Sequence, residues 1–162
     1  MRRKNSYSTS IITGLFLIVI LAALLAIYVY YAEAYTPKIY NTFYVNGKQF
    51  DISSVAITQK QLYHGLMNTT VTNSTLMLFV FPSTGNYPFW MYDTYSNLDI
   101  IWVNNSANGG TVVYVAYNTT PCDIESECAV YNPNAYANYV IETKAGFANE
   151  NNITIGSKII FK

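Results

Sequence analysis

The hydrophobic pattern divides the chain into one long apolar run near its start and a series of short apolar runs after it. Residues 11–31 carry no charged side chain. A helix of this length measures about 31 Å, which is enough to cross the hydrocarbon core of a bilayer. Residues 2–4 are basic, and Glu33 is the first charge after the run. By the positive-inside rule, we expect residues 1–10 in the cytoplasm and a transmembrane signal anchor at 11–31.

The same run has a competing interpretation as a cleaved signal peptide. Residues 32–34 read Ala-Glu-Ala, the small-x-small form of a cleavage site. The run is longer than the core of a typical signal peptide, about 7–15 residues, which favours retention in the membrane. With either interpretation, residues 32–38 form a tether and residues 39–162 form one domain outside the cell.

Short apolar runs separated by turn signals predict that this domain is mainly β. The Asn46-Gly47 pair, the strongest two-residue hairpin signal, joins β-like runs at 40–45 and 48–57. Further strands are predicted at 76–81, 99–103, 111–117, 139–142, 152–155 and 158–161. Short helices are predicted at 58–64, after a capping box that begins at Thr58, and at 134–138, after Asn132-Pro133. We therefore expect a small antiparallel β-sandwich or barrel with short helices.

Composition changes this picture mainly by excluding partners. The chain is 51% hydrophobic and only 11% charged, so it is not a disordered charged tail. Its formal net charge is zero, which leaves no basic face for nucleic acid. The 16 tyrosines stand where charged residues would normally provide solubility, and such surfaces suit interfaces with proteins or glycans. Membrane lipid is the predicted partner of residues 11–31.

Two further features agree with export. Five Asn-x-Ser/Thr sequons follow the apolar run and none precedes it, so we expect two or three of them to carry glycan. They begin at Asn68, Asn73, Asn104, Asn118 and Asn152. The two cysteines of the chain, Cys122 and Cys128, predict a disulfide outside the cell, because their spacing fits neither a CxxC redox motif nor a zinc site.

The order of short motifs along the domain resembles the DUF192 family, also called the uncharacterised ACR family, over residues 49–161. The motifs are Gly65-Leu66-Met67, the strand at 76–81, Phe89-Trp90-Met91, Leu98-Asp99-Ile100, Pro121-Cys122, Tyr139-Val140-Ile141-Glu142, Ala145-Gly146 and Ile155-Gly156. The chain looks like an archaeal, membrane-anchored member. The resemblance implies a jelly-roll-like β-sandwich, often behind a signal peptide or membrane anchor, and no settled activity. Tyr92-Asp93-Thr94 and Gly156-Ser157 depart from the family pattern, so we carry no role over to those polar positions.

Candidate chemistry centres on two carboxylates in apolar strands, Asp99 and Glu142. Burying a carboxylate is costly unless it is hydrogen-bonded or paired. One interpretation is structural, with Asp99 accepting backbone N–H bonds and Glu142 facing solvent. The other places both at one aromatic-lined pocket with Trp90, Met91 and Tyr92.

We expect a non-catalytic accessory subunit or binding module at the cell surface. The alternative is a glycan-directed surface hydrolase that uses Asp99 and Glu142 as paired carboxylates. A third possibility is a structural anchor without a ligand. The single histidine, His64, is more typical of a helix cap or surface residue than of catalysis. We expect no cofactor and no metal, because paired-ligand spacing is missing.

Overall fold

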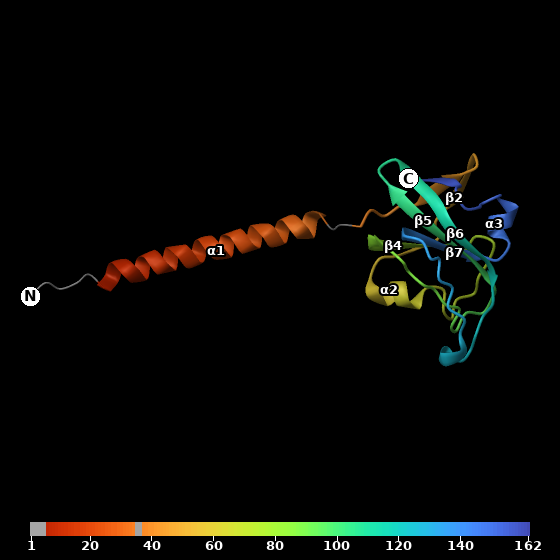
Figure 1. Ribbon diagram of the computed structural model, residues 1–162, viewed down its shortest axis with the longest axis horizontal. Coiled ribbons are helices and arrows are strands. Elements are labelled where there is room, and N and C mark those ends of the chain that lie inside the picture. Colours follow the sequence, from red (N-terminus) through yellow and green to blue (C-terminus); the bar gives the residue numbers. More distant parts are fainter. Residues whose placement is uncertain (1–5, 35–36) are drawn as a thin grey trace, which may run out of the picture. The chain divides into compact units, whose positions relative to one another are not determined.

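The computed structural model describes residues 6–34 and 37–162, and the chain divides into two compact units at residue 36. The first unit contains α1 (Ser6–Ala34), which is drawn as one uninterrupted helix in Figure 1. Its segment Ile11–Tyr30 is, among the described residues, the one helix long and apolar enough to span a membrane. Such a helix suits a membrane anchor or a signal sequence equally. The basic residues 2–4 and tether residues 35–36 lie outside the described residues.

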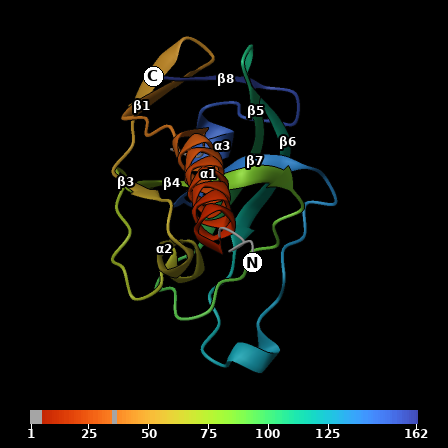
Figure 2. The same cartoon turned by 90° about the vertical axis from the view of Figure 1, so that its left-hand side faces the viewer.

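The second unit is a mainly β domain, as predicted, with eight strands in one mixed sheet (Figures 1 and 2). The sheet order is β2-β1-β8-β6-β5-β7-β4-β3, and β3 pairs with β4 in parallel. The strands are β1 (Thr42–Val45), β2 (Lys48–Asp51), β3 (Ser54–Ala56), β4 (Leu76–Gly85), β5 (Leu98–Ser106), β6 (Gly109–Thr119), β7 (Ala137–Lys144) and β8 (Lys158–Phe161). The remaining strand pairs are antiparallel.

The sheet curls until its two edges approach each other. Strands β2 and β3 occupy opposite edges, yet only Ile52 and Ser53 separate them in sequence. Three peptide links span at most about 11 Å, so the edges must lie close together. The Ile52 N–H donates to Asn41 O at 2.8 Å, and the Ser53 N–H donates to Leu76 O at 2.9 Å. The two layers expected of a sandwich are therefore parts of one sheet.

Each face of the central strands packs into its own core. The inner core joins residues from both halves of the curled sheet, including Phe43, Leu78, Ile101 and Phe161. The outer face carries the second core, in which Phe79 and Trp102 are fully buried. Antiparallel register decides which side chains belong to which face, because directly opposed residues point the same way.

The predicted Asn46-Gly47 hairpin and capping-box helix are both present. The helix α2 (Gln59–His64) begins after Thr58, whose side chain accepts from the Gln61 N–H while the Gln61 side chain accepts from Thr58 N–H. Two short elements were not predicted, the 3-10 helix η1 (Glu125–Glu127) and the helix α3 (Phe147–Glu150).

Two predicted elements are wrong. Residues 134–138 are not helical, because Asn132 Oδ1 accepts from the Asn134 N–H and Asn134 has a φ of 49°, which together form a turn before β7. Residues 152–155 are not a strand. Asn152 has a φ of 52°, and the Thr154 N–H donates to Ser157 Oγ, so this segment turns the chain toward β8.

Candidate functional site

An apolar cavity of about 320 Å³ lies on the outer face of the sheet, between α2, β4 and the segment after β4. Its wall consists of Leu62, Tyr63, His64, Gly65, Leu66, Met67, Phe79, Phe81, Tyr87, Pro88, Phe89, Trp90, Thr94, Val130 and Glu142. Tyr63 and Val130 are largely exposed and border its mouth, whereas Phe79 and Glu142 are buried in its wall. The volume is at the small end of the range for ligand pockets, about 300–1,000 Å³.

Gly65 brings the main chain after α2 close to the sheet. Its N–H donates to Gln61 O at 3.0 Å and ends the helix, and its φ of 50° with ψ of −132° favours glycine. A Cβ atom at this position would lie 3.1 Å from Glu142 Oε2 and 3.2 Å from Phe79 Cζ. The absence of a side chain therefore leaves room for the carboxyl group of Glu142.

Glu142 supplies the buried acidic group of the cavity. It is 4% exposed and lies on β7, with Met77 of β4 and Ile100 of β5 as its cross-strand neighbours. Burial raises the pKa of its carboxyl group from 4.5 to about 8, and a hydrogen bond from the Leu66 backbone opposes part of that rise. Its Oε2 atom has no hydrogen-bond partner among the described residues.

Aromatic rings hold one another in place around this carboxyl group. Phe89 lies edge-on to Phe79, with ring centroids 4.9 Å apart, and Phe81 stacks on Tyr87 at 3.7 Å. Trp90 is half-buried and makes an edge contact with Tyr63, with ring centroids 5.9 Å apart. Such pairs stabilise a fold beyond the area they bury, so the aromatic wall is built largely in advance of any ligand.

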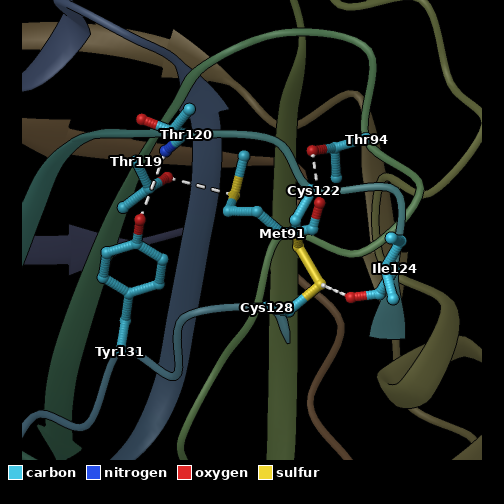
Figure 3. The surroundings of a disulfide bond; sticks show 8 residues. All are labelled: Met91, Thr94, Thr119, Thr120, Cys122, Ile124, Cys128 and Tyr131. Carbon is cyan, nitrogen blue, oxygen red and sulfur yellow. Dashed lines mark hydrogen bonds between the residues drawn. A yellow bond between two sulfur atoms is a disulfide. The ribbon is translucent and has the colours of Figure 1, made fainter. Parts of the chain in front are cut away.

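A disulfide supports the segment that carries Trp90. Cys122 is bonded to Cys128, as predicted, and the surroundings of the bond are shown in Figure 3. The Cys122 N–H donates to Met91 O at 3.2 Å, and the Asp93 N–H donates to Cys122 O at 3.0 Å. The cysteine loop therefore fixes the main chain directly after Trp90.

The predicted binding residues separate into three environments. Trp90 and Glu142 line the cavity together. Met91 is fully buried in the outer core, where the Thr119 hydroxyl lies 3.1 Å from its sulfur atom. Tyr92 is half-buried and does not line the cavity, although its ring centroid is 5.7 Å from that of Trp90.

The prediction that Asp99 shares this pocket is wrong. Asp99 opposes Thr143 on β7, one residue beyond Glu142, so the two carboxylates project to opposite faces of the sheet. Its Oδ1 accepts from the Asn118 N–H at 2.8 Å, and its Oδ2 accepts from the Ala148 N–H at 2.9 Å. Asp99 thus ties β6 and α3 to β5, in agreement with the structural interpretation of this residue. The solvent-facing interpretation of Glu142 is wrong.

Several wall residues were not predicted as binding residues from the sequence, among them Tyr63, Phe79 and Phe89. Phe79 and Phe89 lie in segments that the motifs had marked, the strand at 76–81 and Phe89-Trp90-Met91, whereas no motif marked Tyr63. His64 is exposed at the end of α2 and also borders the cavity. No group of three or more residues able to hold a metal ion occurs in the described part of the chain.

All five sequon asparagines are exposed. Three of them use the side-chain oxygen as an acceptor: Asn68 from the Tyr95 hydroxyl, Asn73 from Lys144 Nζ, and Asn118 from Asn97 Nδ2.

Solved structures that share the fold of this chain include the following two. A protein provisionally described as a transcription regulator, from Sinorhizobium meliloti 1021, has a TM-score of 0.63 and 24% identity, covering 74% of this chain and 90% of its own. A protein of unknown function from Novosphingobium aromaticivorans DSM 12444 has a TM-score of 0.61 and 26% identity, covering 79% of this chain and 94% of its own. No curated protein matches the chain in sequence.

The model of the DUF192 family, described as uncharacterised ACR, matches residues 42–161, which include all eight strands of the sheet. The match also includes every residue of the cavity wall. The chain therefore belongs to the DUF192 family.

Proposed function

We propose that this archaeal-looking member of the family is a non-catalytic binding module, held at the cell surface by Ile11–Tyr30, whose cavity receives a ligand. One observation carries the proposal. An apolar cavity of about 320 Å³, with aromatic walls, contains a buried carboxyl oxygen that has no hydrogen-bond partner within residues 6–34 and 37–162. Cavities that combine apolar walls with few polar groups are the usual form of a ligand site.

Three features support a location outside the cell. The helix segment Ile11–Tyr30 has the length and composition of a membrane span. The disulfide between Cys122 and Cys128 is typical of exported proteins. The five exposed sequon asparagines are accessible to glycosylation. An N-terminus in the cytoplasm and a domain outside follow from the basic residues 2–4.

The separation of the carboxylates favours binding over hydrolysis. Hydrolysis of a glycoside requires two carboxyl groups at one site, roughly 5–9.5 Å apart, and Asp99 lies on the other face of the sheet. The Thr94 hydroxyl, which also belongs to the cavity wall, donates to Met91 O at 2.9 Å.

The test is to isolate the full chain from its own membranes in lipid nanodiscs and to identify retained small molecules by native mass spectrometry. We expect the wild-type chain to retain a molecule that the Trp90→Ala variant loses, because Trp90 is half-buried in the cavity wall. The control is Tyr136→Ala, which removes an aromatic ring that is 69% exposed and does not line the cavity.

A folded Trp90→Ala variant that retains the same molecule at the same occupancy would overturn the cavity as the binding site, as would a wild-type chain that retains none. The near-ultraviolet circular dichroism spectrum establishes that each variant is folded. Membrane proteins recovered with the chain at constant stoichiometry would make it an accessory subunit, whereas recovery of the chain alone with its small molecule would make it a free-standing binder.

A further inference from the structure

The cavity presents an acidic group without a counter-charge. Glu142 Oε2 has no hydrogen-bond partner among the described residues, and the cavity wall contains no Lys or Arg. Among the described residues, this carboxyl group receives a hydrogen bond from the Leu66 backbone. Burying a carboxylate costs free energy unless it is paired with a cation or hydrogen-bonded. A ligand that donates a charged N–H to Oε2 would therefore offset that cost.

The rest of the wall also favours a positive charge. Six of the wall residues are aromatic: Tyr63, Phe79, Phe81, Tyr87, Phe89 and Trp90. The face of an aromatic ring attracts a cation within about 6 Å of its centroid, and this attraction grows when water is excluded. A neutral apolar ligand would use the rings but leave Oε2 without a partner.

We propose that the cavity binds a small organic ammonium ion, with an N–H of the ligand donating to Glu142 Oε2 and the organic body against the aromatic wall. This inference rests on the proposed function and names the class of its ligand. The small volume of the cavity excludes folded macromolecules and accommodates an amine with one ring or a short alkyl chain.

Binding of an ammonium ion is coupled to the loss of a proton. Burial raises the pKa of Glu142 to about 8, so the empty site holds a neutral carboxyl group at pH 7. The incoming ammonium keeps its own protons, the carboxyl group releases its proton to solvent, and an ion pair forms. Other titratable groups in the wall are Tyr63 and His64, both within α2, and Tyr87, after β4. The residues beside Glu142 on the neighbouring strands, Met77 and Ile100, are uncharged.

The experiment is isothermal titration calorimetry on the full chain in nanodiscs without choline lipids, with empty nanodiscs as the blank. The probes are phenethylammonium and its uncharged analogue 2-phenylethanol. At pH 8 we expect wild type to bind the ammonium at least about tenfold more tightly than the alcohol, because only the ammonium makes a charge-assisted hydrogen bond to Glu142. At pH 7, titrations in two buffers of different ionisation enthalpy should show release of about one proton per ligand.

Glu142→Gln should abolish the preference for the ammonium and the proton release. The matched control is Glu125→Gln, which removes a carboxylate from the exposed 3-10 helix and should retain both. Equal affinity of wild type for the two probes would overturn the cation class while leaving the cavity as a binding site. A preference that persists in Glu142→Gln would overturn the role of Glu142. Failure of both probes to bind would also overturn the inference, whereas the proposed function is decided separately by the Trp90→Ala test.

Discussion

Asp99 and Glu142 show how neighbouring strand positions give two carboxylates different roles. Asp99 accepts two backbone N–H bonds within the inner layer of the domain. Glu142 projects to the other face, receives a hydrogen bond from the Leu66 backbone and has one oxygen without a partner in the described part of the chain. The hydrogen bonds of Asp99 stabilise the fold, because they hold main-chain segments together. The unpartnered oxygen of Glu142 can instead accept a hydrogen bond from a ligand.

The raised pKa of Glu142 predicts a pH dependence of stability. The folded-state pKa of about 8 is above the ordinary value of 4.5, so the folded protein keeps a proton that the unfolded chain releases. The stabilisation is complete below pH 4.5 and is lost as pH rises through 8. Relative to Glu142→Gln, we expect the wild-type free energy of unfolding to fall by roughly 1 kcal/mol per pH unit between these limits.

Urea denaturation of the full chain, followed by the fluorescence of Trp90 and Trp102, measures this difference, because both tryptophans lie in the β domain. Asp99→Asn is a control in which stability changes but the pH dependence does not. It should lower the free energy of unfolding at pH 7 by about 2–3 kcal/mol, because an amide cannot accept both N–H bonds. The fall of the free energy of unfolding with pH, which depends on Glu142, should be unchanged. Identical slopes in wild type and Glu142→Gln would show that the carboxyl group titrates normally.

The cysteine loop is the element that connects stability with the site. Its hydrogen bonds to Met91 and Asp93 bracket the main chain after Trp90. The double variant Cys122→Ser/Cys128→Ser should lose about 2–3 kcal/mol of stability, because the short loop gains conformational freedom mainly in the unfolded chain.

The same double variant should also weaken ligand retention in native mass spectrometry, because Trp90 would be held less firmly against the cavity. Thr58→Ala provides a comparison at another wall element, since it removes the capping box of α2 and should cost about 1 kcal/mol. Full retention of ligand by a folded double variant would show that the sheet and α2 position Trp90 without the disulfide.

The described residues comprise one apolar helix and one β domain, and the proposed export of that domain predicts how the chain behaves in membranes and which modifications it carries. We expect the chain isolated from native membranes to remain in the pellet after an alkaline wash and to retain peptides from Ile11–Tyr30, because that segment is long enough to span a bilayer. Mass spectrometry should also find glycan on two or three sequons. A mature chain that begins after Ala34 would identify the helix as a signal peptide, and unmodified sequons throughout would remove the support that glycosylation gives to export.

Patterns of neighbouring residues were enough to predict most of the local elements, and the order of the motifs indicated the family. The Asn46-Gly47 turn and the Thr58 capping box act through residues adjacent in the chain, so pattern alone located them. The disulfide between Cys122 and Cys128 could also be predicted, because the two cysteines are only six residues apart in the chain. Local rules failed at residues 134–138, where the Asn132 side chain stabilised a turn instead of a helix start.

The cavity wall and the directions of the two carboxylates depend on contacts between segments that no local pattern connects. Register between strands places Glu142 beside Ile100 and Asp99 beside Thr143, and a shift of one residue would exchange their faces. Phe79, Trp90 and Tyr63 converge because the curled sheet brings distant segments together. The burial that raises the pKa of Glu142 exists only after this convergence, because the unfolded chain leaves every carboxylate in water.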